Sequence, residues 1–343
     1  MRVLMPDAQF ADPAEIERAV AVGVDFSVHR PERQEDVPEA DWTSCDGIIC
    51  YHEVAIDAAW LARLDRCRII VRAGVGFDNI DLRAAGDRGI AVCNVPDYGT
   101  TDVADHAIAM MLTLTRGTAQ YDRDLRNDPD VGWRFDAPPL LRRLRGAVFG
   151  VVGLGRIGLA AATRARAFGM RVVFHDPYLP TGYDLATGFE RMSSLRELMA
   201  LSDVVSLHTP LDDGTRGLIG AEALAAAKRG LILVNTARGA VVDLDALHAA
   251  LGQGRVAGAA LDVLPVEPVD AGHPLIRAWR EQEPWIVGRM LLSPHAAFYC
   301  PESIADLRRK SAEIAAAGLI EGRLVNCVNR PWLGTGRGWR ATP

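Results

Sequence analysis

The chain has 343 residues, which is too long for one ordinary compact core and suits two domains of typical size. Apolar residues make up 49% of it and charged residues 24%, so the composition favours globular domains over a disordered chain. A net charge of -6, without a run of Lys or Arg, argues against nucleic-acid and anionic-membrane partners.

The N-terminal sequence carries no export signal, because Asp7, Asp12, Glu15 and Glu17 interrupt the apolar runs. No stretch reaches the ~18 apolar residues of a membrane span. We therefore expect a cytoplasmic protein without a membrane partner. The six cysteines form no Cys-x-x-Cys pair and have no His at zinc spacing, so we expect reduced thiols and no bound metal.

Short apolar runs alternate with helical patterns, as is typical of parallel sheets covered by helices. The pattern predicts the α/β fold class. The early strands are expected at Val3–Met5, Val24–Val28, Gly47–Tyr51, Arg68–Val71 and Ile90–Val95, with helices at Pro13–Val22 and Asp57–Leu64.

A long helix is predicted over Asp102–Arg116, followed by a polar, Arg-rich connector over 122–145 that indicates a domain boundary near Thr100. A helix is also expected over Pro301–Glu321, and a loose tail over 334–343. Between them, a second series of strands is expected at Ala147–Val152, Arg171–His175, Val204–His208, Leu231–Asn235, Gly258–Asp262 and Arg289–Leu292.

A glycine motif directly follows the first strand of this second series, at Gly153-Leu154-Gly155-Arg156-Ile157-Gly158. Glycines allow a tight turn and a close approach of the backbone to a pyrophosphate, and the N-terminus of the next helix supplies N–H groups for the phosphates. The motif predicts a dinucleotide site.

Asp176 stands at the end of the next strand. A carboxylate there accepts hydrogen bonds from ribose hydroxyls and repels a 2′-phosphate, so NAD is expected over NADP. No Arg or Lys follows within 177–185. The alternative is that Asp176 only begins a turn with Pro177.

The ends of the later strands carry groups suited to acid–base chemistry. Arg238 can hold a carboxylate, although an arginine at a strand end is often only a solvated charge. Glu267 and His295 follow the next two strands, and a carboxylate bonded to one imidazole nitrogen makes a proton-transfer pair. His208 is a rival base, but its place before Pro210 fits a loop that contacts the cofactor equally well.

These motifs resemble, in order and spacing, the signatures of the D-isomer-specific 2-hydroxyacid dehydrogenases, and they span nearly the whole chain. The matching segments are Val71–Asp81, Gly153–Gly158, Asn235–Gly239, Asp262–Pro268 and Pro294–His295. Within that family the chain is most similar to the C-terminal binding protein branch, on the segments 51–52, 168–179, 295–299 and 326–329.

The resemblance implies NAD-dependent hydride transfer between a D-2-hydroxy acid and a 2-oxo acid. It assigns substrate binding to Arg238, proton transfer to Glu267 and His295, and contact with the nicotinamide amide to Asp262. The substrate side would be lined by Tyr51, Arg72, Gly74, Val75, Gly76, Arg238 and Phe298. The cofactor would be contacted by Gly153, Leu154, Gly155, Arg156, Ile157, Gly158, Asp176, His208, Thr209, Pro210, Thr215, Thr236, Ala237, Arg238, Asp262 and His295.

The resemblance also implies the domain organisation. A flavodoxin-like substrate domain would comprise 1–99 and 295–330, a Rossmann NAD-binding domain 100–294, and a tail 331–343, with the active site in the cleft between the domains. A homodimer contact is expected at the helix Asp102–Arg116, which has more apolar surface than a boundary helix requires.

Two other functions share this fold. Animal members of the same branch act as NAD(H)-responsive corepressors, although the chain lacks a basic localisation cluster and keeps the Arg, Glu and His set. The second is formate or phosphite oxidation; formate dehydrogenases of the family are expected to carry Gln where Glu267 stands, which argues against that option.

The segment Ala271–Arg289 is longer than the usual family connection and predicts a helix over His273–Glu283. Its Trp279 and Trp285 either anchor a surface elaboration or border an apolar pocket. In the second case, 2-oxo acids with medium apolar or aromatic side chains would be preferred over 3-phosphohydroxypyruvate, because no spare Arg or Lys balances a second negative charge.

Overall fold

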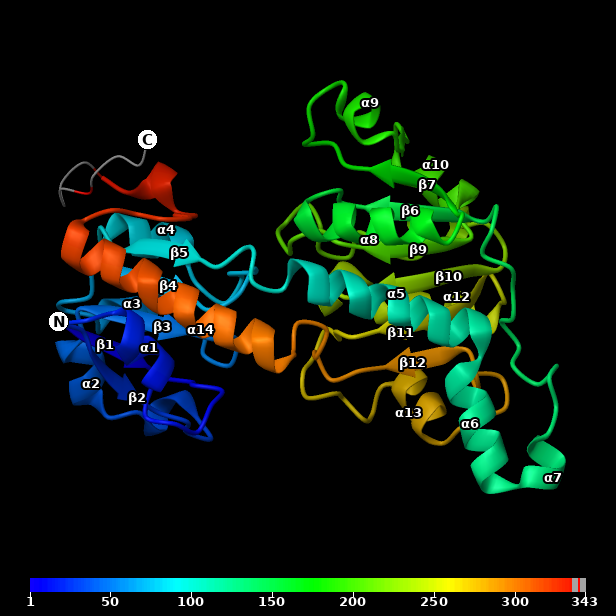
Figure 1. The fold of residues 1–343 in the computed structure, drawn as a ribbon, viewed down its shortest axis with the longest axis horizontal. Coiled ribbons are helices and arrows are strands. Elements are labelled where there is room, and N and C mark those ends of the chain that lie inside the picture. The colour runs from blue at the N-terminus through cyan, green and yellow to red at the C-terminus, as the bar shows by residue number, and fades with distance from the viewer. Residues whose placement is uncertain (335–338, 340–343) are drawn as a thin grey trace. The chain divides into compact units, whose positions relative to one another are not determined.

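The computed structural model describes residues 1–334 and residue 339, and it divides the chain into two compact units (Figure 1). Unit 1 comprises Met1–Gly99 and Tyr299–Pro343, and unit 2 comprises Thr100–Phe298. The family resemblance implies that 295–298 belong to the first domain, but this segment lies in unit 2, where the Ala296 and Ala297 amides donate to Asp262. Within the described residues, no helix has the length and apolar character needed to cross a membrane.

Unit 1 contains a five-stranded parallel sheet in the order β2-β1-β3-β4-β5, which is the flavodoxin-like order. The five early apolar runs all form strands of this sheet. They are β1 (Arg2–Met5), β2 (Asp25–Val28), β3 (Gly47–Cys50), β4 (Ile69–Arg72) and β5 (Ala91–Asn94).

Helices cover both faces of this sheet, because successive side chains of each buried strand point to opposite faces and both sets are apolar. One face packs against α1 (Glu15–Val20), α14 (Pro301–Ala316) and the π-helical turn Ala317–Glu321. The other face packs against α2 (Glu39–Ser44), α3 (Ala58–Ala62) and α4 (Leu82–Asp87). A 3-10 turn, Gln34–Asp36, precedes α2.

A buried ion pair ties the C-terminal helix α14 to α1. The Arg308 guanidinium donates to Glu17 at 2.8 and 2.7 Å, and it also donates to Asp12 at 2.7 Å. The hydrogen bond from Arg308 lowers the pKa of Asp12 to about 2. Glu17 is fully buried, and burial of its charge is tolerated because both carboxylate oxygens are paired.

Unit 2 contains a seven-stranded parallel sheet in the order β12-β11-β10-β9-β6-β7-β8. With β6 as the first strand, this is the doubly wound order of dinucleotide-binding folds, extended by β12. The strands are β6 (Val148–Val152), β7 (Arg171–His175), β8 (Glu190–Arg191), β9 (Val204–Leu207), β10 (Leu231–Asn235), β11 (Val256–Leu261) and β12 (Met290–Leu292). Only β8 was not expected, because two residues leave no periodicity to detect.

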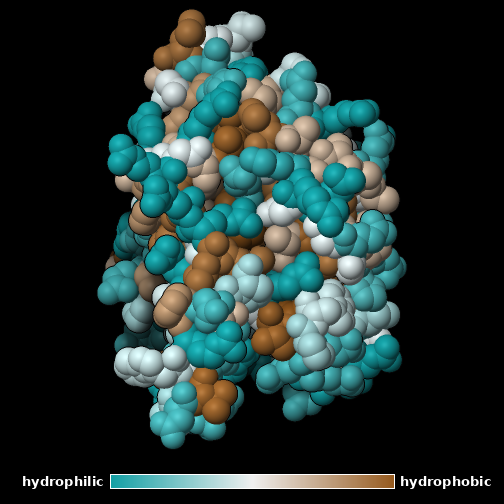
Figure 2. Space-filling model, turned by 90° about the vertical axis from the view of Figure 1, so that its right-hand side faces the viewer, coloured by the Kyte–Doolittle hydropathy of each residue, from teal (hydrophilic) through white to brown (hydrophobic). Residues whose placement is uncertain are grey.

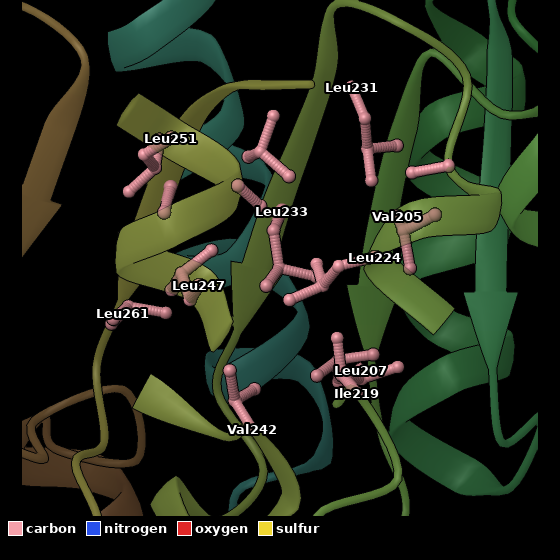
Figure 3. Packing of buried hydrophobic residues seen from close by; sticks show 14 of the residues in the cluster. Val205, Leu207, Ile219, Leu224, Leu231, Leu233, Val242, Leu247, Leu251 and Leu261 are labelled. Carbon is pink, nitrogen blue, oxygen red and sulfur yellow. The ribbon is translucent and has the colours of Figure 1, made fainter. Parts of the chain in front are cut away.

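The helices of unit 2 also form two layers. On one face of the sheet lie α5 (Thr100–Arg116) and α8 (Arg156–Ala167). On the other lie α10 (Leu195–Leu201), α11 (Ala221–Ala226), α12 (Leu244–Gly252) and α13 (Pro274–Arg280). Figure 3 shows Val205, Leu207, Leu231 and Leu233 of the sheet against Leu224, Leu247 and Leu251 of the helices. A short helix α9 (Tyr183–Thr187) precedes β8.

The segment expected as a polar connector, 122–145, is partly helical. The helix α6 (Thr118–Asn127) continues from α5, and α7 (Pro129–Gly132) follows it. Neither helix has a buried residue. The helix α6 is rich in charged and polar residues, so its composition resembles that of an exposed connector.

The long helix α5 uses its apolar residues inside unit 2. Seven of them are buried: Val103, Ala104, Ala107, Ile108, Met110, Met111 and Leu114. The last five of these belong to the core that α5 shares with α8 and the sheet. This packing explains the apolar character that the sequence pattern had attributed to a partner copy.

The expected tail beyond residue 330 begins with ordered structure. Arg330–Trp332 forms a 3-10 turn, and Trp332 packs so closely on Gly86 that a Cβ there would lie 2.5 Å from the Trp332 Cβ. Residues 335–338 and 340–343 of the expected tail lie outside the described residues.

Candidate active site

The predicted cofactor and catalytic residues of unit 2 follow the carboxyl ends of its strands. Because every strand pair in this sheet is parallel, these ends meet at one edge. The strand order reverses between β6 and β9, and ligands of doubly wound sheets bind at such a point.

The glycine motif forms the tight turn between β6 and α8. Gly153 has a φ of 85°, and a Cβ there would lie 2.8 Å from the His208 carbonyl oxygen. A Cβ on Gly158 would lie 2.1 Å from the Gly153 carbonyl oxygen. Both positions therefore require glycine, one for backbone conformation and the other for the close packing of α8 on the turn.

The N-terminus of α8 is open to a ligand. Gly155 is its N-cap and makes no side-chain cap hydrogen bond, and a Cβ there would meet nothing within 4 Å. The first N–H groups of a helix have no partner within it, and the helix dipole favours a negative charge beside them. A pyrophosphate therefore fits this end of α8.

Asp176 is fixed beside the turn. Its Oδ2 accepts a hydrogen bond of 3.0 Å from the Leu154 amide, and its Oδ1 accepts one of 3.0 Å from the Tyr178 amide. Each carboxylate oxygen can accept a further hydrogen bond from a ribose hydroxyl.

Arg191 of β8 lies near the same loop, although no Arg or Lys follows Asp176 within 177–185. Its terminal nitrogens donate to the carbonyl oxygens of Asp176, Leu179 and Pro180 at 3.3, 3.1 and 2.8 Å. These bonds give the guanidinium a structural role in holding the loop that follows β7.

Two threonines beside the turn carry buried hydroxyls that lack a hydrogen-bond partner among the described residues. They are Thr209 and Thr236, at the ends of β9 and β10. Buried polar groups are usually paired, so these hydroxyls are suited to a ligand. Thr215, by contrast, donates to the Pro210 carbonyl oxygen at 2.7 Å and accepts from the Asp212 amide, so its hydroxyl stabilises its own loop.

His295 and Glu267 are brought together as a hydrogen-bonded pair. The distance from His295 Nδ1 to Glu267 Oε2 is 2.7 Å, and Glu267 Oε1 accepts from the Leu264 amide at 2.9 Å. Phe298 lies edge-on to the imidazole, with ring centroids 6.1 Å apart. The carboxylate therefore orients the ring through Nδ1.

The loop that carries Arg238 packs against the segment leading to Glu267. A Cβ on Gly239 would lie 1.9 Å from the Leu264 carbonyl carbon, so only glycine fits between the two loops. Asn235 braces the turn, since its Nδ2 donates to the Arg238 carbonyl oxygen at 2.9 Å and its Oδ1 accepts from the Ala237 amide at 3.0 Å.

His208 has a different environment from His295. Burial lowers the pKa of His208 to about 4, so it is neutral at neutral pH. Its Nε2 lies 2.9 Å from the Ser206 hydroxyl, and its carbonyl oxygen lies against Gly153. These contacts associate His208 with the glycine turn.

Asp262 holds the segment that contains His295. Its Oδ1 accepts from Ser293 Oγ at 2.5 Å and from the Ala296 amide at 2.9 Å, and its Oδ2 accepts from the Ala297 amide at 3.0 Å. The Asp262 side chain is 1% exposed. Contact of Asp262 with the nicotinamide amide, as the resemblance implies, stays a prediction.

The remaining predicted substrate residues, apart from Phe298, belong to unit 1. Arg72 ends β4, and a Cβ on Gly74 would collide with its guanidinium at 1.4 Å. Asn94 Nδ2 donates to the Val75 carbonyl oxygen at 2.7 Å and so braces the 74–76 loop. The Tyr51 side chain is buried, and its hydroxyl has no partner among the described residues.

Asp7 is a buried residue of unit 1 that the sequence pattern missed. Its carboxylate accepts the backbone amides of Tyr51, Glu53 and Val54 at 2.9, 3.2 and 3.2 Å. Burial raises the pKa of Asp7 to about 6. An isolated Asp after a strand gives no sequence signal for this clamp.

No group of three metal-ligating side chains occurs among residues 1–334 and residue 339, and the six cysteines are free. Unit 2 therefore presents a glycine turn, an open helix N-terminus, a fixed carboxylate, a guanidinium loop and a His–Glu pair. The first three suit a dinucleotide, and the last two suit proton transfer on a carboxylate substrate.

Comparison with known proteins agrees with a dinucleotide site in unit 2. The model of the family "D-isomer specific 2-hydroxyacid dehydrogenase, NAD binding domain" matches residues 108–297. The chain is 37% identical to C-terminal-binding protein 1 of Caenorhabditis elegans over 82% of its own length and 39% of that protein's length. It is 37% identical to glyoxylate reductase of Korarchaeum cryptofilum over 80% of its own length and 79% of the relative's.

A solved structure is similar over nearly the whole chain. It is D-lactate dehydrogenase from Aquifex aeolicus complexed with NAD and lactic acid, at a TM-score of 0.79 and 28% identity. The match covers 96% of this chain and 99% of that one.

Proposed function

Since this chain belongs to the D-isomer specific 2-hydroxyacid dehydrogenase family, we propose that it interconverts a D-2-hydroxy acid and a 2-oxo acid. Its unit 2 is an NAD-binding domain, and NAD, when bound, supplies the hydride acceptor. The observation that carries the proposal is the hydrogen bond of 2.7 Å between His295 Nδ1 and Glu267 Oε2.

The His–Glu pair performs the proton transfer. Because Glu267 engages Nδ1, the other ring nitrogen, Nε2, is the one that takes the hydroxyl proton during oxidation and returns it during reduction. Glu267 itself is oriented by the Leu264 amide, so the imidazole is aimed by a chain of two hydrogen bonds. Such orientation lowers the cost of aligning acid and substrate.

Arg238 binds the substrate carboxylate. A planar guanidinium forms paired hydrogen bonds with a carboxylate, which fixes the position of the neighbouring C2 atom. Because Gly239 has no side chain, the Arg238 loop can pack closely against the segment that leads to Glu267. Arg72, Val75 and Phe298 are proposed to line the substrate side.

The test is a panel of 2-oxo acids with NADH, followed at the nicotinamide absorbance. We expect turnover, with phenylpyruvate and 2-oxoisocaproate preferred over glyoxylate and 3-phosphohydroxypyruvate. His295→Ala should lower kcat by about 10²- to 10⁴-fold with little change in the Kd of NADH, as for other general acids and bases. His248→Gln, on α12, controls for loss of a histidine.

Retained turnover in His295→Ala together with lost turnover in His208→Ala would assign the base to His208 instead. A preference for glyoxylate or 3-phosphohydroxypyruvate would contradict the proposed apolar pocket. Trp279 and Trp285 do not support an apolar substrate pocket, because both pack against the core of unit 2.

The identity with C-terminal-binding protein 1 favours a second candidate, an NAD(H)-responsive binding protein with little turnover. The same panel separates the two functions. Tight NADH binding without turnover of any 2-oxo acid would support the binding protein.

We also propose a homodimer. Unit 2 exposes Val131, Trp133 and Phe135 in and after α7, with exposed fractions of 69, 81 and 90%. On the face drawn in Figure 2, hydrophobic residues are exposed among hydrophilic ones. Large exposed apolar side chains that lie close in sequence suit a contact with a second copy.

A further inference from the structure

His106 is a histidine of α5 that none of the motifs includes. It lies 187 residues before Ser293, and its Nε2 is 3.0 Å from the Ser293 hydroxyl. The same Nε2 is 3.6 Å from Asp262 Oδ1. The helix α5 thus reaches the segment that carries His295.

The direction of the hydrogen bonds follows from the chemistry of the three groups. Asp262 Oδ1 can only accept when ionised, so the Ser293 hydroxyl donates to it across 2.5 Å. The Ser293 oxygen is then the acceptor for His106, whose Nε2 must carry a proton. The chain of donors therefore runs from His106 to Ser293 to Asp262.

This series of hydrogen bonds ends on the Asp262 carboxylate, which shapes the segment that contains His295. Asp262 accepts the amides of Ala296 and Ala297, and its carbonyl oxygen accepts the His295 amide at 2.8 Å. His295 has a φ of 50°, a strained conformation for a residue with a Cβ. Such a conformation persists only when the surrounding bonds enforce it.

We infer that His106 is a positioning residue: through Ser293 and Asp262, it fixes the backbone conformation that aims His295. The inference rests on the proposed function for its catalytic consequence. The geometric part, the coupling of α5 to the 293–297 segment, stands without it. His106 does not touch the reacting atoms and acts only through its neighbours.

The test compares His106→Leu, His106→Gln and Ser293→Ala with the control Thr113→Val. Gln keeps an N–H near the position of Nε2, whereas Leu keeps volume but no donor. Thr113 lies on the same helix, and its hydroxyl donates to the Ala109 carbonyl oxygen at 2.8 Å within α5. Circular dichroism and the Kd of NADH confirm that each variant is folded.

The first readout needs no activity. In the protein without cofactor, the Ala296 and Ala297 amides should exchange with solvent on the order of 10-fold faster in His106→Leu and Ser293→Ala, since each loses one hydrogen bond of the chain. His106→Gln should restore slow exchange, and Thr113→Val should match the unaltered protein. Equal exchange in His106→Leu and the unaltered protein would overturn the inference, whatever the activity.

The second readout is the split between kcat and KM. We expect kcat to fall by about 10- to 100-fold in His106→Leu, as for other groups that orient an active residue, with KM little changed. The kcat of the double variant His106→Leu/Ser293→Ala should fall no further than that of the more impaired single variant, because both substitutions interrupt the same series of hydrogen bonds. Additive losses would overturn the inference. If the unaltered protein turns over no 2-oxo acid while exchange still responds, the proposed function fails and the positioning of the segment is supported.

Discussion

We expect His208→Gln to change how the stability of unit 2 depends on pH. Burial lowers the pKa of His208 from 6.5 to about 4 in the folded protein. The unfolded chain therefore binds the proton more readily over this range. The contribution of neutral His208 to the free energy of unfolding is fully present above pH 6.5 and is lost as the pH falls towards 4.

The two pKa values set the size of the effect. At about 1.36 kcal/mol per pKa unit, a fall of the pKa from 6.5 to about 4 corresponds to roughly 3 kcal/mol, most of which is lost by pH 4.5. Gln does not titrate, and its amide can replace the contact of Nε2 with the Ser206 hydroxyl. The variant should therefore be less sensitive to acid than the unaltered protein.

The assay is urea unfolding at pH 7.5 and pH 4.5. Unfolding is monitored by hydrogen exchange of the β9 and β10 amides, which report on unit 2. Between pH 7.5 and pH 4.5, the free energy of unfolding should fall by roughly 2–3 kcal/mol less in His208→Gln than in the unaltered protein. Val205→Ala, in the strand β9 that precedes His208, should lower the free energy of unfolding by the same amount at both pH values. An equal difference for His208→Gln at both pH values would refute the burial argument.

Three further predictions concern the cofactor, a thiol and assembly. Asp176→Asn keeps an acceptor for the Leu154 amide but removes the charge, so the preference for NADH over NADPH should narrow by about 10-fold; an unchanged ratio of kcat/KM would contradict the role of the carboxylate. The neighbouring Cys93 thiol lowers the pKa of Cys327 below the usual range of a thiol, so iodoacetamide at pH 7.5 should modify Cys327 first, and labelling that begins elsewhere would argue against this. Light scattering should give the mass of a dimer, and the Kd of this dimer should rise in Trp133→Ser. A monomer mass at micromolar concentration would exclude the proposed contact.

Local sequence patterns predicted most of the strands and the glycine turn. The run that became β6 is apolar throughout, and the runs that became β7 and β10 are apolar at 172–174 and 231–234, as buried parallel strands require. Gly153 and Gly158 could be assigned to a cofactor turn because backbone conformation and close packing admit no other residue there. Helices without a buried face, such as α6, could not be found by the same reasoning.

The roles of single side chains were less accessible. The pairing of Glu267 with His295 was implied only by the family resemblance, because residue order alone does not show which side chains meet. The structure places His295 Nδ1 and Glu267 Oε2 2.7 Å apart. Arg191 and Asp7 escaped notice, since their partners are backbone groups of loops whose positions no residue pattern encodes. The apolar residues of α5 were attributed to a partner copy, although they are buried in unit 2.

The sequence by itself determined the fold class, the cofactor turn and the residue types of the chemistry, because backbone preference and apolar periodicity act over a few neighbouring residues. Only the tertiary structure decided that His106, Ser293 and Asp262 meet. These residues come from α5 and from the ends of β12 and β11, and α5 packs on a face of the sheet whose strand order places β11 beside β12. A contact between residues 187 apart depends on that packing, which no short segment of the chain specifies.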